Sequence, residues 1–338
     1  MSNPVVSVLC VTYNHAGFIR DCLEGFVKQK CDFDFEVLIH DDASTDGTQE
    51  IIKEYWEKYP DIIKPILQTE NQWSKKAGGM NLRFNYPRAR GKYIALCDGD
   101  DFWIDEKKLQ KQVTFLENNP DFSVVCSAFL KIEDGEETPV IRNNKTSPEK
   151  DGEHGSTFDL DDHNKAWFYL VRPSTTLFRN VPEKVEVLKK YEFSFDVHLF
   201  YHLLKMGEGY YSKEVAVGCY HHQGGVHSGS SPQELILAHY YILKELYETD
   251  KNEVIRAQYL NIAFRLINLK ISGLMPSSKI KNELLKTKNI SASQIYKEIK
   301  PLLKTKAEQN RLYKSYIPYQ LKLLKSKSKK LLNLPKRD

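Results

Sequence analysis

The sequence predicts an α/β fold in which a doubly wound, mixed but mostly parallel sheet carries helices on both faces, followed by an α-helical C-terminal extension. Two observations predict it. Over the first 132 residues, short β-branched runs alternate with segments of helical apolar periodicity, which is typical of parallel strands joined by right-handed crossovers. After residue 232 the apolar periodicity is helical throughout. We therefore expect an α/β domain over 1–230 and a helical region over 231–338.

The elements of the α/β domain follow from local patterns. Continuous apolar runs indicate strands buried on both faces, and we place them at 5–11, 35–39, 62–67, 92–97 and 123–132. The third contains Pro65, which marks a short or edge strand. Helices are expected between these strands and over 195–205, with a further strand over 168–178 and a strand or hairpin over 209–220. Residues 133–165 are acidic and poorly periodic, so we expect a loop that includes an acidic surface segment at 159–163.

Composition limits the class of protein. A hydrophobic content of 41% and an aromatic content of 12% are those of a packed globular chain. The six cysteines form no CxxC pair, which favours a reducing compartment. We see no signal peptide at the N-terminus and no apolar run of the ~18 residues that a membrane span needs. We therefore expect a cytoplasmic protein.

The net charge of +4 is unevenly distributed, because residues 300–338 hold twelve Lys or Arg and two acids. In this tail, leucines alternate with lysines in a basic amphipathic pattern that suits an anionic membrane surface. A solvated or disordered tail and a nucleic-acid contact are the alternatives. We expect peripheral contact of 300–338 with the inner face of the cell membrane, and no nucleic-acid partner.

The most informative stretch is Asp98-Gly99-Asp100-Asp101, which directly follows the apolar run 93–97. Three carboxylates within four positions repel one another unless a cation neutralises them. Oxygen ligands suit Mg²⁺ or Mn²⁺, and such an ion is commonly shared with a phosphate group. The stretch therefore predicts a metal-bridged diphosphate site, and a solvated acidic turn is the alternative.

Two other strands end in polar residues of complementary chemistry. Tyr13 follows the first strand and Asp42 follows the second, so both should lie at the sheet edge where the acidic turn lies. An aromatic face can stack on a nucleobase, and a carboxylate can accept its N–H. The sequence contains neither a P-loop nor a GxGxxG motif at this point. The convergence predicts a nucleoside-diphosphate site of another kind.

These stretches resemble the family 2 glycosyltransferases of the GT-A fold, of the bacterial cell-surface polysaccharide type. The resemblance covers about residues 4–130 strongly and 170–230 more weakly, and nothing beyond 232. It is carried by Val6-Ser7-Val8-Leu9-Cys10-Val11-Thr12-Tyr13-Asn14, Asp41-Asp42-Ala43-Ser44-Thr45-Asp46-Gly47-Thr48, Glu70-Asn71-Gln72, Arg90-Gly91-Lys92-Tyr93-Ile94-Ala95-Leu96-Cys97, Asp98-Gly99-Asp100-Asp101 and Lys108-Leu109-Gln110-Lys111-Gln112-Val113.

The resemblance implies a metal-dependent, inverting transfer of a sugar from a nucleotide sugar, usually a UDP-sugar, with Mn²⁺ or Mg²⁺ as cofactor. It places nucleotide-sugar binding in residues 1–130 and the acceptor side in 131–230. Asp98 would contact the ribose or the metal, Asp100 would bind the metal, and Asp101 would share this work. By the same resemblance the nucleotide sugar would be held by Thr12, Tyr13, Asn14, Asp42, Asn71, Asp98 and Asp101.

The same family places its general base at the start of a helix after the acceptor-binding strands, often as Glu-Asp. The matching position is Asp196, which Phe195 precedes in place of Glu. The alternative is that Asp196 only caps the helix, and Glu192 is the next carboxylate to consider.

A third metal ligand is expected in the histidine-rich turn that follows residue 219. Aligned on Gly224-Gly225 and Ser228, the histidine of the subgroup's pattern falls on His222. The pattern's arginine falls on Tyr220, so a diphosphate-binding arginine is missing there. A zinc site built from Cys219 and these histidines is the alternative, although its spacing fits no common pattern.

The function expected is a hexosyltransferase-like enzyme that acts on a saccharide or lipid-linked saccharide acceptor in bacterial surface polysaccharide synthesis. One alternative is a non-catalytic nucleotide-sugar binding or assembly module. The other is a nucleotidyltransferase, which is disfavoured because the first loop lacks a glycine-rich basic signature. The donor sugar, the acceptor and the linkage have no readable signature in the sequence.

Overall fold

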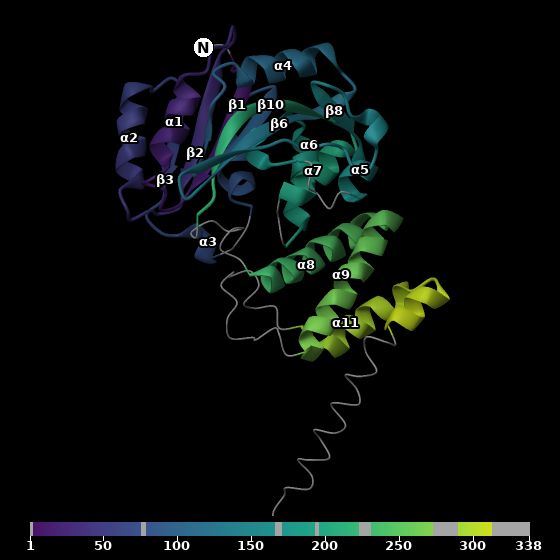
Figure 1. Cartoon of the computed structure of the whole chain (residues 1–338). Coiled ribbons are helices and arrows are strands. Elements are labelled where there is room, and N and C mark those ends of the chain that lie inside the picture. Colours follow the sequence, from purple (N-terminus) through teal and green to yellow (C-terminus); the bar gives the residue numbers. More distant parts are fainter. Residues whose placement is uncertain are drawn as a thin grey trace, which may run out of the picture. The chain divides into compact units, whose positions relative to one another are not determined.

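A computed structural model describes residues 3–75, 79–165, 171–192, 196–222, 231–272 and 290–312 (Figure 1). The chain divides into two compact units, residues 1–228 and 229–338.

The first unit is built on one mixed sheet. Among the described residues its strands follow the order β3-β2-β1-β4-β9-β6-β10-β5, with β7 paired to β6 and β8 to β10. Six of them run in one direction: β1 (Val6–Thr12), β2 (Phe35–Asp41), β3 (Ile63–Leu67), β4 (Tyr93–Asp98), β6 (Phe122–Glu133) and β10 (Glu208–Tyr220). Four run in the opposite direction: β5 (Asp101–Trp103), β7 (Glu136–Val140), β8 (Gly155–Phe158) and β9 (Leu177–Arg179). The predicted mixed, mostly parallel sheet is confirmed, and β3 lies at its edge.

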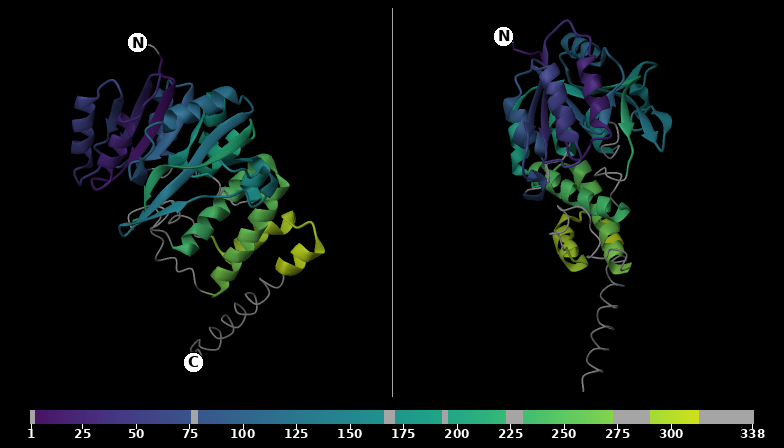
Figure 2. Two further views of the ribbon diagram at one scale, coloured as in Figure 1. Left: turned by 45° about the horizontal axis from the view of Figure 1, so that its top comes forward. Right: turned by 90° about the vertical axis from the view of Figure 1, so that its left-hand side faces the viewer.

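Helices lie on both faces of this sheet (Figure 2). Side chains alternate along β1, so that Val8 and Cys10 face one core and Leu9 faces the other. The first core is completed by α1 (Ile19–Val27), α2 (Thr48–Lys58) and α4 (Lys108–Asn118), and the second by α7 (Asp196–Leu204). The shorter helices are α3 (Gln72–Lys75), α5 (Leu160–Lys165) and α6 (Pro182–Glu186), with single helical turns at Asn81–Asn85, Tyr86–Arg88, Pro148–Lys150, Pro173–Thr175 and Val187–Lys190.

Three expectations for the middle of the chain are wrong. Residues 133–165 hold β7, β8 and α5 rather than only a loop. The segment 159–163 is not a surface loop, because Asp162 and His163 are buried in α5, where Asp162 accepts hydrogen bonds from Thr146 (2.9 Å) and Lys150 (2.7 Å). The strand expected over 168–178 is confined, among its described residues, to 177–178 of β9, because Pro173 begins a 3₁₀ turn.

The second unit contains α8 (Pro232–Asp250), α9 (Glu253–Ser272), α11 (Ala292–Ile299) and the turn Lys300–Leu302, which confirms the helical C-terminal extension. Ser231 and Glu234 form a capping box at the start of α8. The helices bury leucines and tyrosines, and the hydroxyl of Tyr240 donates to Glu298 (2.7 Å). Residues 313–338, which hold most of the predicted basic tail, lie outside the described residues.

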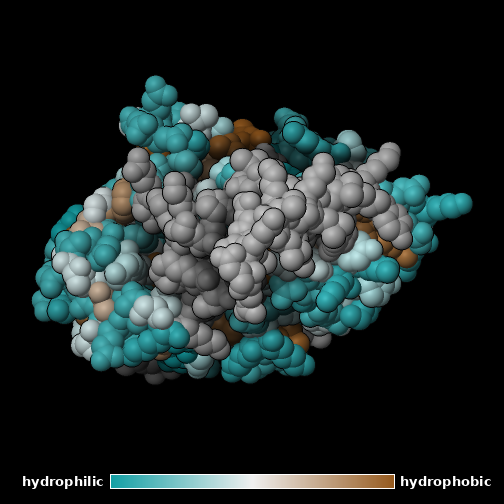
Figure 3. Space-filling model, turned by 90° about the horizontal axis from the view of Figure 1, so that it is seen from below, coloured by the Kyte–Doolittle hydropathy of each residue, from teal (hydrophilic) through white to brown (hydrophobic). Residues whose placement is uncertain are grey.

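None of the described helices is both long enough and apolar enough to span a membrane. On the face shown in Figure 3, the surface of the described residues is mostly hydrophilic, with small apolar patches.

Candidate nucleotide-sugar site

The ends of three parallel strands place the predicted residues at one sheet edge. In the sheet register, Thr12 of β1 is paired with Asp41 of β2, and Val11 with Asp98 of β4. The polar residues that follow each strand therefore emerge side by side. Thr12 is buried at this edge, while Tyr13 is 48% exposed and presents its ring to solvent.

The loops after β1 and β2 are tied together by side chains. Asn14 adopts a positive φ of 54°, its N–H donates to the Ser44 hydroxyl (2.8 Å), and its side-chain oxygen accepts from the N–H of Thr45 (2.9 Å). Asn14 therefore fixes the shape of the loop beside Tyr13. Its contact with a nucleotide stays a prediction.

The carboxylate of Asp42 is buried and already bonded. Its two oxygens accept from the backbone N–H groups of Gln72 (2.7 Å) and Trp73 (3.0 Å), at the start of α3. Asn71 lies beside it and donates to the Asp42 carbonyl oxygen (3.2 Å). The structure brings Asp42 and Asn71 together as the sequence suggests, and their binding of the base stays a prediction.

The acidic turn packs closely against β1 because position 99 is glycine. A Cβ there would lie 2.7 Å from the Thr12 Cβ and 2.8 Å from its hydroxyl oxygen. Burial, followed by the neighbouring carboxylates of Asp100, Asp196 and Asp101, raises the pKa of Asp98 well above its ordinary value. The turn thus holds more negative charge than its surroundings compensate.

Asp101 differs from its neighbours because it has an arginine as a partner. It is buried, accepts a hydrogen bond from the Ser174 hydroxyl, and lies 3.4 Å from Nη2 of Arg172. The guanidinium of Arg172 also lies over the ring of Phe129, 4.9 Å from its centroid. These contacts fix the end of the acidic turn, and a direct role of Asp101 in ligand binding stays a prediction. Sequence reasoning missed Arg172 and Ser174, because both lie in the segment predicted as a strand.

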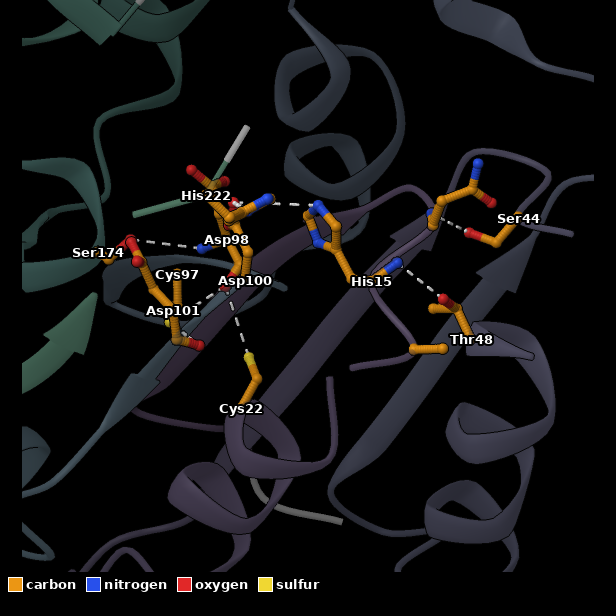
Figure 4. A network of polar contacts seen from close by, with 12 residues as sticks. His15, Cys22, Ser44, Thr48, Cys97, Asp98, Asp100, Asp101, Ser174 and His222 are labelled. Atoms are coloured by element: carbon orange, nitrogen blue, oxygen red, sulfur yellow. Dashed lines mark hydrogen bonds and ion pairs between the residues drawn. The ribbon is translucent and has the colours of Figure 1, made fainter. Parts of the chain in front are cut away.

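Asp100 meets two imidazoles (Figure 4). Its Oδ2 lies 3.1 Å from Nε2 of His222 and 4.0 Å from Nε2 of His15. His222 was expected here, whereas His15 was not. The only sequence signal for His15 is its place just after the first strand.

The residues around Asp100 fit a divalent ion. Carboxylate oxygens from Asp98 and Asp100 and an imidazole nitrogen from His222 are donors that Mn²⁺ accepts, and the crowded acids require positive charge. Among the residues that the structure describes, no group of three or more His, Cys, Asp and Glu side chains is already arranged to hold a metal. The same absence of an arranged ligand group holds, among the described residues, for the alternative zinc site at Cys219, which is buried on β10.

Asp196 is the first residue of α7, where a carboxylate is favoured by the helix dipole, yet its surroundings also suit a base. Its side chain reaches solvent, while the surrounding protein raises the pKa of its carboxyl to about 6 through desolvation. Asp196 is also close enough to Asp98 to act on its pKa.

Comparison with known proteins agrees with this geometry. Residues 7–175, half of the chain, match the family model described as glycosyl transferase family 2. The chain belongs to this family. The matched segment of this family 2 chain contains the loops after β1 and β2, the acidic turn and Ser174.

Curated relatives support the same family over a shorter span. An uncharacterized protein of Mycobacterium tuberculosis, Rv1520, is 42% identical over 134 residues, which are 38% of this chain and 37% of the relative. The putative glycosyltransferase EpsE of Bacillus subtilis is 37% identical over 129 residues, 38% of this chain and 44% of EpsE. The chain thus matches less than half the length of these relatives.

Solved structures share the fold of this family 2 chain. The crystal structure of S. aureus TarS has a TM-score of 0.57 at 19% identity, covering 93% of this chain and 53% of TarS. The mannosyltransferase PcManGT of Pyrobaculum calidifontis, in complex with GDP-Man and Mn²⁺, has a TM-score of 0.51 at 17% identity, covering 95% of this chain and 83% of that one. At such identities the likeness concerns the fold, which confirms the GT-A architecture.

Proposed function

We propose that the protein is a metal-dependent glycosyltransferase that transfers a sugar, with inversion, from a nucleotide sugar to a hydroxyl of a saccharide or lipid-linked saccharide. The observation that carries the proposal is the meeting of Tyr13, Asp42, the acidic turn and Asp196 in one unit. Membership of the family supports it, and so do the structures of TarS with UDP-GlcNAc and of PcManGT with GDP-Man and Mn²⁺.

In this proposal the donor lies along the sheet edge. Tyr13 stacks on the base, which we take to be uracil, and the loops of Asn14, Asp42 and Asn71 hold the nucleoside. Asp98 contacts the ribose or the metal, Asp100 and His222 hold Mn²⁺ or Mg²⁺, and Asp101 with Arg172 supports the turn. The divalent ion, when bound, would offset the negative charge of the diphosphate as it leaves.

Asp196 acts on the acceptor. Its carboxylate accepts the proton of the attacking hydroxyl while that oxygen bonds to the anomeric carbon. The bond from this carbon to the diphosphate oxygen breaks on the opposite face, and the electron pair leaves with the nucleoside diphosphate. A carboxyl whose pKa is about 6 is largely ionised at neutral pH and is still basic enough to assist.

The acceptor follows from relatives rather than from the site. EpsE is named a putative glycosyltransferase, and TuaG of Bacillus subtilis a putative teichuronic acid biosynthesis glycosyltransferase. We infer a role in bacterial surface polysaccharide synthesis, on the cytoplasmic side, with the basic tail close to the membrane.

A thermal-shift screen of nucleotide sugars with Mn²⁺, followed by donor hydrolysis, tests the proposal. A ligand at 100 times its dissociation constant should add about 2.7 kcal/mol of stability. Binding without any hydrolysis or transfer would favour the non-catalytic module. Binding of a nucleoside triphosphate in preference to every nucleotide sugar would favour a nucleotidyltransferase.

A further inference from the structure

Tyr220 occupies the position where the family pattern has an arginine, and its side chain contacts residues of α1 and β5. The ring of Tyr220 packs against Phe18 (centroids 5.0 Å apart) and Phe102 (5.3 Å). Its hydroxyl donates to Asp21 in α1 (2.7 Å). Tyr220 therefore anchors the end of β10 to α1, and brings no charge to the diphosphate.

This aromatic contact continues to the histidines. Phe18 stacks on His222, with ring centroids 4.5 Å apart and an interplanar angle of 30°. The ring of His15 meets Phe18 edge-on at 6.3 Å and His222 edge-on at 6.2 Å. Phe18 thus orients two imidazoles that come from opposite ends of the unit's sequence.

His15 is held in place but is poorly satisfied. Its backbone N–H donates to the Thr48 hydroxyl (2.9 Å). Its Nδ1 is buried without a hydrogen-bond partner in the described part of the chain, and faces Gly99, where a Cβ would lie 3.1 Å away. Its Nε2 is directed toward Asp100, yet at 4.0 Å it is too far away for a hydrogen bond. When the ring of His15 carries its proton on Nε2, this N–H has no acceptor within hydrogen-bond distance at Asp100. It is therefore suited to donate to an oxygen atom that enters the gap between His15 and Asp100.

We propose that His15 and His222 form a paired-imidazole subsite for the diphosphate of the donor, oriented by Phe18, in place of an arginine. This inference rests on the proposed function. His222 shares the metal with Asp100, and His15 donates its Nε2–H to a diphosphate oxygen. The ligand is a diphosphate because both imidazoles face the same Oδ2 of Asp100, and a divalent ion held there takes phosphate oxygens into its coordination shell.

The decisive experiment compares two ligands that differ only in the diphosphate. Binding of UDP with Mn²⁺ is measured by calorimetry, and binding of uridine by NMR titration, for wild type, His15→Ala and His15→Gln. In His15→Ala, loss of one charge-assisted hydrogen bond should weaken UDP binding roughly tenfold or more and leave uridine binding unchanged. His15→Gln keeps an amide N–H donor, so it should lose less UDP affinity than His15→Ala. Thermal melts verify that each variant is folded.

Three further variants locate the effect. Phe18→Leu should also weaken UDP, whereas Phe18→Tyr, which keeps the ring, should restore it. His221→Ala is the matched control, because His221 is exposed and pairs with Glu133 (2.6 Å), so UDP binding should stay at the wild-type level. The affinity of Mn²⁺ alone, followed by electron paramagnetic resonance, should be unchanged in His15→Ala.

Several results would overturn the inference. Equal UDP affinity in wild type and both His15 variants would show that His15 does not contact the diphosphate. Parallel losses of UDP and uridine would make His15 a scaffold residue, and a loss of Mn²⁺ alone would make it a metal ligand. Failure of the proposed function is separable from these results, since the wild-type protein would then bind neither UDP nor any nucleotide sugar.

Discussion

At the scale of residues, the acids of the turn divide into two kinds. Asp101 pairs with Arg172 and accepts a hydrogen bond from Ser174, whereas Asp98 lies among other acids and Asp100 faces His222. The first kind maintains the shape of the turn and the second is available to a ligand. Substitutions at the two kinds should therefore differ in what they damage.

Asp100→Asn should abolish sugar transfer while the protein stays folded, because it removes a charge and a ligand but almost no volume. UDP affinity, measured with and without Mn²⁺, should lose its dependence on the metal. Asp161→Asn is the control, since Asp161 is exposed and pairs with Lys165. Full activity of Asp100→Asn in the presence of a chelator would contradict the metal assignment.

The pH dependence of the reaction should report Asp196. A base acts only when ionised, and desolvation raises the pKa of this carboxyl to about 6. As pH falls below about 6, kcat/KM should therefore decrease, approaching tenfold per pH unit. A profile that is flat down to pH 5 would argue that another group accepts the proton.

Asp196→Asn should lower kcat by about 10²-fold or more and leave donor binding nearly unchanged, because the role proposed for Asp196 concerns the acceptor. Single-turnover rates and UDP affinity measure the two effects separately. Normal turnover in this variant would transfer the role to another carboxylate, with Glu192 the next to test.

The sequence could place some of these residues and not others, for a physical reason. Carboxyl ends of parallel strands meet at one edge, so Tyr13, Asp42 and Asp98 could be predicted to gather from strand order alone. The contact of Arg172 with Asp101 joins residues 71 apart through an irregular turn. Such a turn has no periodicity, and therefore gives no signal before the fold is known.

At the scale of elements, side chains of β5 and α4 donate hydrogen bonds to the turn at Pro173–Thr175. The Trp103 ring N–H donates to the Ser174 carbonyl (3.1 Å), and the Gln112 amide donates to the Thr175 carbonyl (2.8 Å). Gln112 in turn accepts from the ammonium of Lys108 (2.8 Å), which lies over the Trp103 ring. Burial lowers the pKa of Lys108 to about 7.

Lys108→Met should therefore change how stability depends on pH. The unfolded chain binds this proton up to about pH 10.4, whereas the folded protein releases it above about 7. Wild-type stability then rises with pH between these values, by up to about 1.4 kcal/mol per unit. The stability of Lys108→Met relative to wild type should be greatest at pH 7 and shrink toward pH 10.

Urea unfolding at pH 7 and at pH 9.5 measures this difference. Lys107→Met is the matched control, because the neighbouring Lys107 is exposed. A difference between Lys108→Met and wild type that stays constant across pH would show that Lys108 titrates normally.

Strands could be predicted from the sequence where nearly all of their residues are buried. β1, β2 and β4 are buried on both faces and read as continuous apolar runs. β7 is largely exposed and rich in glutamate, and it exists because β6 extends beyond the core and offers it a partner. Its pairing is decided by that neighbour, so its own residues did not predict it.

At the scale of the whole molecule, the first part of the basic segment 300–338 belongs to the helical unit rather than to a separate tail. Lys304 pairs with Glu253 (2.6 Å), Arg256 pairs with Glu308 (3.1 Å), and Leu312 is buried. Residues 300–312 thus pack with α9 in the helical unit. The remaining 313–338 carry eight Lys or Arg and one acid.

Truncation after Leu312 should leave donor hydrolysis intact and reduce co-sedimentation with anionic vesicles, most strongly at low salt. Each basic residue near an anionic surface contributes about 1 kcal/mol, and salt screens this attraction. Neutral vesicles serve as the control. If the full-length protein does not bind anionic vesicles at low salt, the tail is instead a packing or assembly element.

The 122-residue separation of Asp100 and His222 affects how the protein is made. During synthesis β1 to β4 emerge first, and β1 can pair with β2 and β4 before the rest of the sheet exists. The other neighbour of β4, which is β9, emerges later. His222 emerges only after β10, the last strand of the sheet. A nascent chain would therefore contain Tyr13 and Asp42, the proposed nucleoside contacts, before it contained His222, the proposed metal ligand. An unfinished copy would lack the complete site that the proposed sugar transfer needs.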